Sequence, residues 1–210
     1  KGLWFSIKIG VKIRVNKRLP MDSCQFKVAV IGDMGVGKTS ISMRYIRGCF
    51  DFKVQPTVGS AHDIATVNVK GVEVDLLLWD TAGSEKYAPL LPMYTRDVDA
   101  CIIVGSIVDP ESCDRISAWH KIIQDNGEDP PIIVAINKID IENRSILKRE
   151  DIIKKTQSNY PDMFFVSART GECIDDLFQI VALRAYENRK PQVQQPLGLV
   201  RNSEGEKKCC

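Results

Sequence analysis

A glycine-rich octapeptide, GDMGVGKT at residues 32–39, has the spacing of a phosphate-binding loop. It follows a short apolar run and precedes a helical pattern that extends to Arg47. Glycines let backbone N–H groups curl around an anion, and the start of a helix adds partial positive charge. Lys38 is therefore expected to reach the β- and γ-phosphates of a nucleotide, and the Thr39 hydroxyl to ligate Mg²⁺. The loop residues predicted to line this nucleotide site are Gly32, Asp33, Met34, Gly35, Val36, Gly37, Lys38, Thr39 and Ser40.

An acidic residue is also needed to hold a metal ion at such a loop, and it usually lies at the end of a neighbouring strand. Asp80 meets this requirement, since it comes directly after the apolar run LLLW. Gly83 can bring its N–H group to a γ-phosphate without a Cβ in the way. Upstream, Thr57 lies in a segment, 49–60, with no secondary-structure period, and it could offer a second hydroxyl to the metal. The predicted Mg²⁺ ligands are Thr39, Thr57 and Asp80.

A third motif is suited to reading a purine base. Asn137, Lys138 and Asp140 follow the apolar run PIIVAI. Guanine presents N1–H and N2–H₂ donors that a carboxylate accepts bidentately, whereas adenine would leave the Asp140 carboxylate unpaired. The Lys138 stem can cover the base, and Asn137 can tie this loop to the phosphate loop. Further along, a backbone N–H could approach the guanine carbonyl from the segment made of Ser167, Ala168 and Arg169.

Alternating apolar runs and helical patterns must position these motifs. The predicted strands are 26–32, 64–70, 72–79, 100–108, 131–137 and 163–168. One predicted helix follows the glycine-rich loop and extends to Arg47, and three more span about 112–124, 146–158 and 173–188. Only the pair joined at Lys70-Gly71 has hairpin spacing. We therefore predict an α/β P-loop NTPase fold, with a mostly parallel six-stranded sheet, one antiparallel strand and helices on both faces. Ligands of such sheets bind beyond the carboxyl ends of the strands, where all three motifs fall.

The net charge of +2 over 210 residues conceals an uneven distribution. Residues 1–20 contain six basic residues and no acid, so the remaining chain carries a net charge of −4. We interpret 1–20 as a non-native or disordered leader, with a real basic arm that contacts membrane or nucleic acid as the alternative. Residues 21–190 form the predicted nucleotide-binding domain, and 191–210 a flexible tail that ends in Cys209 and Cys210. No apolar run approaches the roughly 18 residues of a membrane-spanning helix.

The seven cysteines are odd in number and lack metal-binding spacing, so we predict a reducing, intracellular environment. Five of them lie inside the chain and are expected to act as small core hydrophobes: Cys24, Cys49, Cys101, Cys113 and Cys173.

The three motifs together resemble the Ras superfamily of small GTPases, over about 24–188. Trp79 before DTAG, the stretch MYTR at 93–96 and the terminal pair Cys209-Cys210 resemble the Rab branch. The resemblance implies a GTP/GDP switch with Mg²⁺ in vesicle trafficking, prenylated on both terminal cysteines. It also implies an exchange factor, a GTPase-activating protein, a GDP-dissociation inhibitor and Rab-type effectors as partners. We expect a monomer at the cytoplasmic face of intracellular membranes with a cytosolic pool, and no nucleic-acid partner.

The resemblance also assigns roles to individual residues. Phe50, seven residues before Thr57, corresponds to an aromatic residue that packs against guanine. Of the aromatic triad on the family's effector face, Trp79 and Tyr94 are present, and His62 replaces the third member. The residues expected to act in hydrolysis are Lys38, Thr57, Gly83 and Ser84.

Two departures from the family pattern bear on chemistry. Ser84 follows DTAG where the family usually has the Gln that orients the attacking water, and Met34 stands where efficient members keep a small residue. Slow intrinsic hydrolysis is therefore expected. The alternatives are a membrane-tethered GTP-binding scaffold that hardly hydrolyses, and a P-loop ATPase or nucleotide kinase, which the base-reading motif disfavours.

Overall fold

The computed structural model describes residues 24–53, 55, 57, 60–69, 71–83 and 90–189. Within these residues six strands form one sheet in the order β2-β3-β1-β4-β5-β6. Only β2 runs antiparallel, against β3; all the other neighbours pair in parallel. The strands are β1 (Cys24–Gly32), β2 (Ser60–Val69), β3 (Val72–Thr81), β4 (Ala100–Ser106), β5 (Ile132–Asn137) and β6 (Met163–Phe165). The predicted fold class and hairpin are confirmed.

Burial along the strands follows their place in the sheet. All seven residues of β4 are buried, because this central strand has helices on both of its faces. The edge strand β2 instead alternates exposed and buried residues from Ala65 to Val69. The long apolar run ACIIVG and the alternating ATVNV therefore indicate a central and an edge position respectively.

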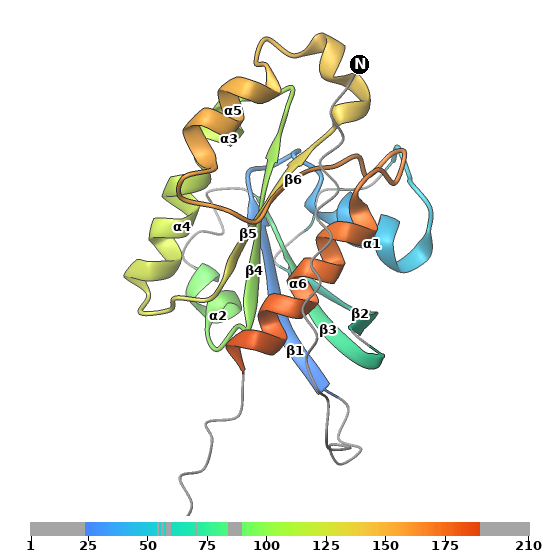
Figure 1. The fold of residues 1–210 in the computed structure, drawn as a ribbon, viewed down its shortest axis with the longest axis vertical. Helices are drawn as coiled ribbons and strands as arrows, with labels where there is room; N and C mark the ends of the chain where they lie inside the picture. The colour runs from blue at the N-terminus through green and yellow to red at the C-terminus, as the bar shows by residue number, and fades with distance from the viewer. Residues whose placement is uncertain are drawn as a thin grey trace, which may run out of the picture.

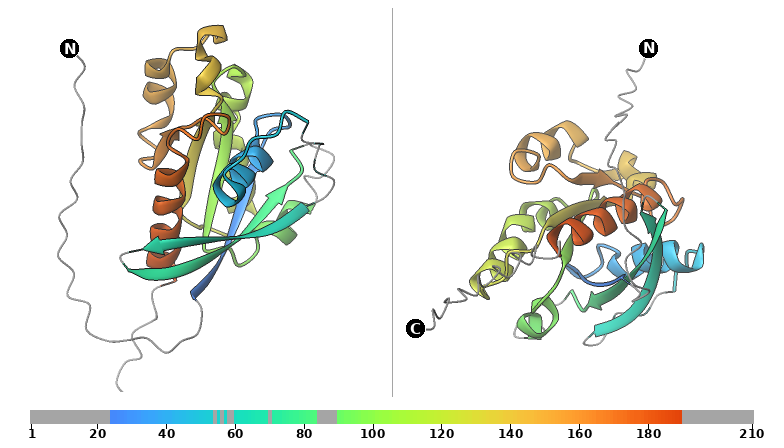
Figure 2. Two further views of the ribbon diagram at one scale, coloured as in Figure 1. Left: turned by 90° about the vertical axis from the view of Figure 1, so that its right-hand side faces the viewer. Right: turned by 60° about the horizontal axis from the view of Figure 1, so that its bottom comes forward.

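Helices cover both faces of the sheet (Figures 1 and 2). One face packs on α1 (Lys38–Arg47) and α6 (Ile174–Asn188), and buries Ile41, Leu177 and Phe178 against β1 and β3. The other face packs on the remaining helices, α2 (Leu91–Thr95), α3 (Pro110–Asp114), α4 (Ile116–Asp125) and α5 (Arg149–Thr156). A 3₁₀ segment, Ile139–Arg144, precedes α5. None of the described helices is long and apolar enough to cross a bilayer.

Two helical patterns are shorter or less continuous than the sequence predicts. The pattern at 112–124 is two helices, α3 and α4, which meet at Arg115. The pattern at 146–158 is one helix of eight residues, α5, because Lys148 is still extended and the chain leaves the helix after Thr156. The strand predicted over 163–168 is confined to Met163–Phe165.

The prediction for the internal cysteines is partly wrong. Cys101 and Cys113 are buried, and burial raises the pKa of the Cys113 thiol to about 11. Cys49 and Cys173 are exposed, because the first follows the glycine that ends α1 and the second caps α6 with a positive φ of 55°. The side chain of Cys24, the leader 1–20 and the tail 191–210 lie outside what the structure describes.

Candidate functional site

The phosphate loop joins the carboxyl end of β1 to α1, as predicted. Gly37 caps α1 with φ 100°, and a Cβ there would stand 2.4 Å from Asn137 Nδ2, so only glycine fits this turn. Lys38 is 6% exposed and donates to the carbonyl oxygens of Gly32 (2.9 Å) and Asp33 (2.8 Å). Burial lowers the pKa of Lys38 to about 8, against the attraction of Asp80 and Asp33. The loop thus holds a buried cation at its centre, which is the arrangement that receives phosphate.

The three predicted metal ligands come together beside the loop. Thr39, in the first turn of α1, donates from Oγ1 to Asp80 Oδ2 at 2.5 Å and lies 3.0 Å from the Oγ1 of Thr57. Thr57 Oγ1 is 3.4 Å from the same carboxylate oxygen. Burial raises the pKa of Asp80, and these hydroxyls together with Lys38 partly oppose that rise. Residues separated by 41 positions therefore converge on one buried carboxylate.

The second oxygen of this carboxylate has no protein partner. Asp80 Oδ1 is fully buried, and nothing in the described part of the chain bonds to it. A buried carboxylate oxygen without a donor is costly unless a cation or water meets it. Mg²⁺ prefers such oxygen ligands and is held by one or two carboxylates together with hydroxyls, water and phosphate. The residues present fit the ion. Among the described residues there is also no cluster of three His, Cys, Asp or Glu side chains that would offer an alternative metal site.

Gly83 lies directly against the phosphate loop. A Cβ on this residue would stand 2.3 Å from Lys38 Nζ and 2.4 Å from the Asp33 carbonyl. Only a residue without a side chain can approach the loop this closely. The contact of its N–H group with a γ-phosphate stays a prediction. Ser84 falls outside the described residues.

The base-reading loop is bonded to the phosphate loop, as the sequence predicts. Asn137 donates from Nδ2 to the Val36 carbonyl (2.9 Å) and accepts from the Ala168 N–H (3.1 Å). Lys138, with φ 69°, donates from Nζ to the Gly35 carbonyl at 2.6 Å, and burial lowers its pKa. Two segments over 100 positions apart in the chain are thus held as one unit. The Ala168 N–H is occupied by Asn137 in this arrangement.

Asp140 is held in place by its neighbours on the next strand end. Its Oδ1 accepts from Ser167 Oγ at 2.7 Å, and its Oδ2 lies 3.7 Å from Nη1 of Arg169. Arg169 also lies over the Phe52 ring, 5.3 Å from its centroid, and Phe52 packs edge-to-face on the half-buried Phe50. The predicted base-contacting residues therefore surround one place at the carboxyl edge of the sheet.

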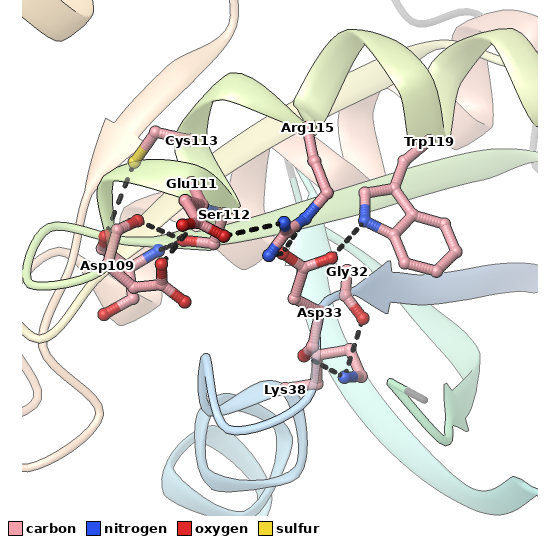
Figure 3. Close-up of polar contacts among 10 residues, drawn as sticks. Gly32, Asp33, Lys38, Asp109, Glu111, Ser112, Cys113, Arg115 and Trp119 are labelled. Atoms are coloured by element: carbon pink, nitrogen blue, oxygen red, sulfur yellow. Dashed lines mark hydrogen bonds and ion pairs between the residues drawn. The ribbon is translucent and has the colours of Figure 1, made fainter. Parts of the chain in front are cut away.

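Two residues that the sequence did not identify, Arg115 at the α3–α4 junction and Trp119 in α4, contact the phosphate loop. Arg115 and Trp119 both bond to the Asp33 side chain, as Figure 3 shows. The only signal in the sequence is their spacing of four residues in a helical pattern, which places them on one face but does not name a partner.

The aromatic side chains of the predicted effector face are adjacent. Trp79 lies 5.2 Å from the His62 ring and 6.1 Å from the Tyr94 ring, between centroids. His62 is opposite Trp79 in the β2–β3 register, so it occupies the place of the third aromatic residue. The second histidine, His120, is half-buried and hydrogen-bonded to the Tyr160 hydroxyl (3.1 Å).

The fold and the phosphate loop together define a P-loop nucleotide-binding protein. A family model described as the Ras family matches residues 27–187. The chain is similar to the Ras-related protein Rab5 of Nicotiana tabacum, with 35% identity over 83% of this chain and 86% of that protein. It is similar to the Ras-related protein RHN1 of Nicotiana plumbaginifolia, with 34% identity over 88% and 94%. This chain belongs to the Ras family of small GTPases and is Rab-like. Membership implies guanine-nucleotide binding, GTP hydrolase activity, and regulators and effectors in general.

Proposed function

We propose that this chain is a Rab-like switch that binds GTP and GDP with Mg²⁺ and hydrolyses GTP slowly. The observation that carries the proposal is the cluster of Thr39, Thr57 and Asp80, with one buried carboxylate oxygen left for a cation. It stands beside a loop whose buried Lys38 is suited to phosphate. The domain that does this spans 21–190, between a leader, 1–20, and a tail, 191–210.

In this proposal the hydroxyls of Thr39 and Thr57 and the carboxylate of Asp80 hold Mg²⁺, directly or through water. The bound ion neutralises charge on the β- and γ-phosphate oxygens. Lys38 shares that task, and the Gly83 N–H binds the γ-phosphate. Because GDP lacks this phosphate, Thr57 and Gly83 are the two points at which the chain distinguishes GTP from GDP, which is how such a switch couples hydrolysis to conformation.

Base recognition is assigned to Asp140, with Asn137, Lys138 and the segment 167–169 as its support and Phe50 against the ring. Mg²⁺·GTP should bind at least about 10³-fold more tightly than Mg²⁺·ATP, because adenine cannot supply the donors that Asp140 accepts. Competition of ATP against a fluorescent GTP measures the ratio of the two affinities. The Asp140→Ala variant should lose the preference for GTP. Equal affinities in the wild type would favour an ATPase or a nucleotide kinase instead.

Hydrolysis requires water to attack the γ-phosphorus as the bond to the β–γ bridging oxygen breaks, releasing GDP and phosphate. A serine hydroxyl at position 84 is too short to hold that water from the backbone position where the family has Gln. Met34 is 68% exposed. In this proposal its bulk hinders the approach of the attacking water and of an activator's arginine. Both residues predict a slow intrinsic rate.

Single-turnover GTP hydrolysis tests this directly. We expect Ser84→Gln to raise the rate about tenfold or more, because general positioning of the attacking group contributes factors of this size, and Met34→Gly to add to it. Equal rates for wild type and Ser84→Gln would contradict the assignment. A wild-type rate that stays at background even with an activating protein would favour the scaffold alternative, for which the exposed Met34 is the supporting observation.

Membrane attachment is proposed through prenylation of Cys209 and Cys210, since two lipid chains give a stable anchor where one does not. The chain would then work in vesicle trafficking at the cytoplasmic face of intracellular membranes, as a monomer with a cytosolic pool. Intact mass of protein isolated from its own cells should show two prenyl groups. Replacing both cysteines by Ser should move the protein wholly to the cytosolic fraction; continued membrane binding would contradict the proposal.

A further inference from the structure

The phosphate loop contains one acidic residue, Asp33, and its carboxylate is buried. The residue is 8% exposed and lies where the loop must also accept the negative charge of a nucleotide. Both carboxylate oxygens accept hydrogen bonds. Trp119, in α4, donates from Nε1 to Oδ1 at 2.9 Å, and Arg115, at the α3–α4 junction, donates to Oδ2 from Nε and Nη2, each at 2.6 Å. These partners stand 82 and 86 positions away in the chain, and Figure 3 shows them converging on the loop.

The position of these two side chains is fixed by the start of α3. Asp109 caps this helix, accepting from the Ser112 N–H at 3.3 Å. The Ser112 hydroxyl accepts from the Ser106 N–H (2.9 Å) and donates to the Asp109 carbonyl (2.6 Å), which ties the helix to the end of β4. Arg115 and Trp119 follow at the α3–α4 junction and one turn later, on the same helix face. The residues that bond to Asp33 therefore follow a helix start that is hydrogen-bonded to the end of β4.

Asp33 connects Arg115 and Trp119 to Lys38, the cation proposed to bind phosphate. Its carbonyl oxygen accepts from Lys38 Nζ at 2.8 Å, while its side chain is held by Arg115 and Trp119. An unpaired buried carboxylate here would repel an incoming triphosphate, since charges this far from water are weakly screened. The guanidinium of Arg115 compensates that charge and fixes the orientation of the Asp33 side chain.

We propose that Arg115 and Trp119 are positioning residues of the nucleotide site: they neutralise and orient the Asp33 carboxylate, and thereby set how tightly the phosphate loop holds a nucleotide. The inference rests on the proposed role of this loop as the phosphate site. It adds a support from the α3–α4 junction and α4 that acts on the loop through Asp33.

Nucleotide dissociation measured with fluorescent GTP and GDP on the full chain tests the proposal. Arg115→Met should raise the GTP dissociation rate about tenfold, because breaking one partner of a buried pair leaves the other charge uncompensated, an effect reduced here by the half-exposed arginine. GDP, with less charge, should be affected less. Asp33→Asn combined with Arg115→Met should return both rates to within about twofold of wild type, because no buried charge is then left unpaired: the other partner of Arg115, Glu111, is exposed to solvent.

The matched control is Arg149→Met. Arg149 also places Nε and Nη2 on a single carboxylate oxygen, Glu142 Oε2, each at 2.6 Å, but away from the phosphate loop. Its loss should leave both dissociation rates unchanged. If Arg115→Met proves insoluble, Arg115→Gln removes the same charge with less loss of volume, and the same direction is expected.

Two results would overturn the inference. One is a GTP dissociation rate in Arg115→Met, or in its Gln replacement, equal to that of Arg149→Met. The other is a double variant as fast as Arg115→Met alone, which would mean that packing rather than charge is at stake. Either result leaves the proposed function standing as long as wild type binds GTP, whereas a wild type that binds no guanine nucleotide defeats the proposed function itself.

Discussion

Asp33 and Asp80 are two buried carboxylates at the same end of the sheet, and the protein treats them differently. Asp33 has donors on both oxygens, from Arg115 and Trp119. Asp80 has hydroxyls on one oxygen and, among the described residues, nothing on the other. A buried charge that is compensated internally is part of the framework, whereas one left half-bonded is prepared for a ligand from outside. The difference separates the carboxylate that supports the loop from the one that is proposed to bind the metal.

The largest expected effect comes from removing the metal. If Asp80 holds Mg²⁺ beside the nucleotide, as proposed, chelating the ion should speed GDP dissociation about 100-fold in the wild type, at the upper end of the 10- to 100-fold losses that follow when a metal site is disturbed. Dissociation of fluorescent GDP with and without EDTA measures this. Asp80→Asn should already be fast and should hardly respond to EDTA. An Asp80→Asn variant that keeps the full EDTA response would show that the ion is held elsewhere.

A smaller effect is expected at Gly83, which approaches the loop from the metal side. Gly83→Ala would place a Cβ 2.4 Å from the Asp33 carbonyl, so the segment must move away from the loop. Because only GTP has a γ-phosphate for the Gly83 N–H, the GTP affinity should fall about tenfold, the cost of one charge-assisted hydrogen bond. GDP affinity is the internal control and should change little. An equal loss for both nucleotides would contradict the assigned role.

The smallest effect is expected on the framework side, at Trp119. Trp119→Phe keeps the aromatic packing but removes the indole N–H that bonds to Asp33 Oδ1. Loss of this one hydrogen bond, while Arg115 still pairs with the carboxylate, should raise the GDP dissociation rate about threefold to fivefold. Stopped-flow or filter-based release assays resolve such a difference. Trp119→Phe in the Asp33→Asn background should then have a smaller effect, since the carboxylate is absent.

The convergence of Thr39 and Thr57 on Asp80 could be predicted from the sequence, and the contacts of Asp33 could not. Asp80 and the phosphate loop are each set by short-range order, a strand that ends in a polar residue or a glycine turn. The parallel sheet then brings such ends to one edge. The link from Asn137 to the phosphate loop followed from the same rule. Asp80, the phosphate loop and Asn137 all lie at the ends of strands, and strand ends can be recognised in the sequence from where an apolar run stops.

The contacts of Arg115 depend on features that a linear pattern does not carry. The helical pattern at 112–124 was predicted as one helix, so the junction that directs Arg115 toward Asp33 was missed. The exposure of Cys49 and Cys173 was not predicted for a related reason. Cys49 follows the left-handed Gly48 that ends α1, and Cys173 is itself the left-handed residue before α6. Where a helix begins and ends depends on tertiary packing, which the periodicity of a sequence does not carry.

The unfolding free energies of Asp33→Asn and Asp80→Asn, measured without nucleotide or Mg²⁺, test the central comparison most directly. Burial raises the pKa of Asp80, so its ionised form costs stability at neutral pH, and Asn should stabilise the protein by about 1 kcal/mol. Asp33→Asn should instead destabilise it by about 1 kcal/mol, because the Arg115 pair is lost. We predict opposite signs in denaturant titrations. Two changes of the same sign would contradict the distinction between a carboxylate satisfied from within and one that awaits a cation.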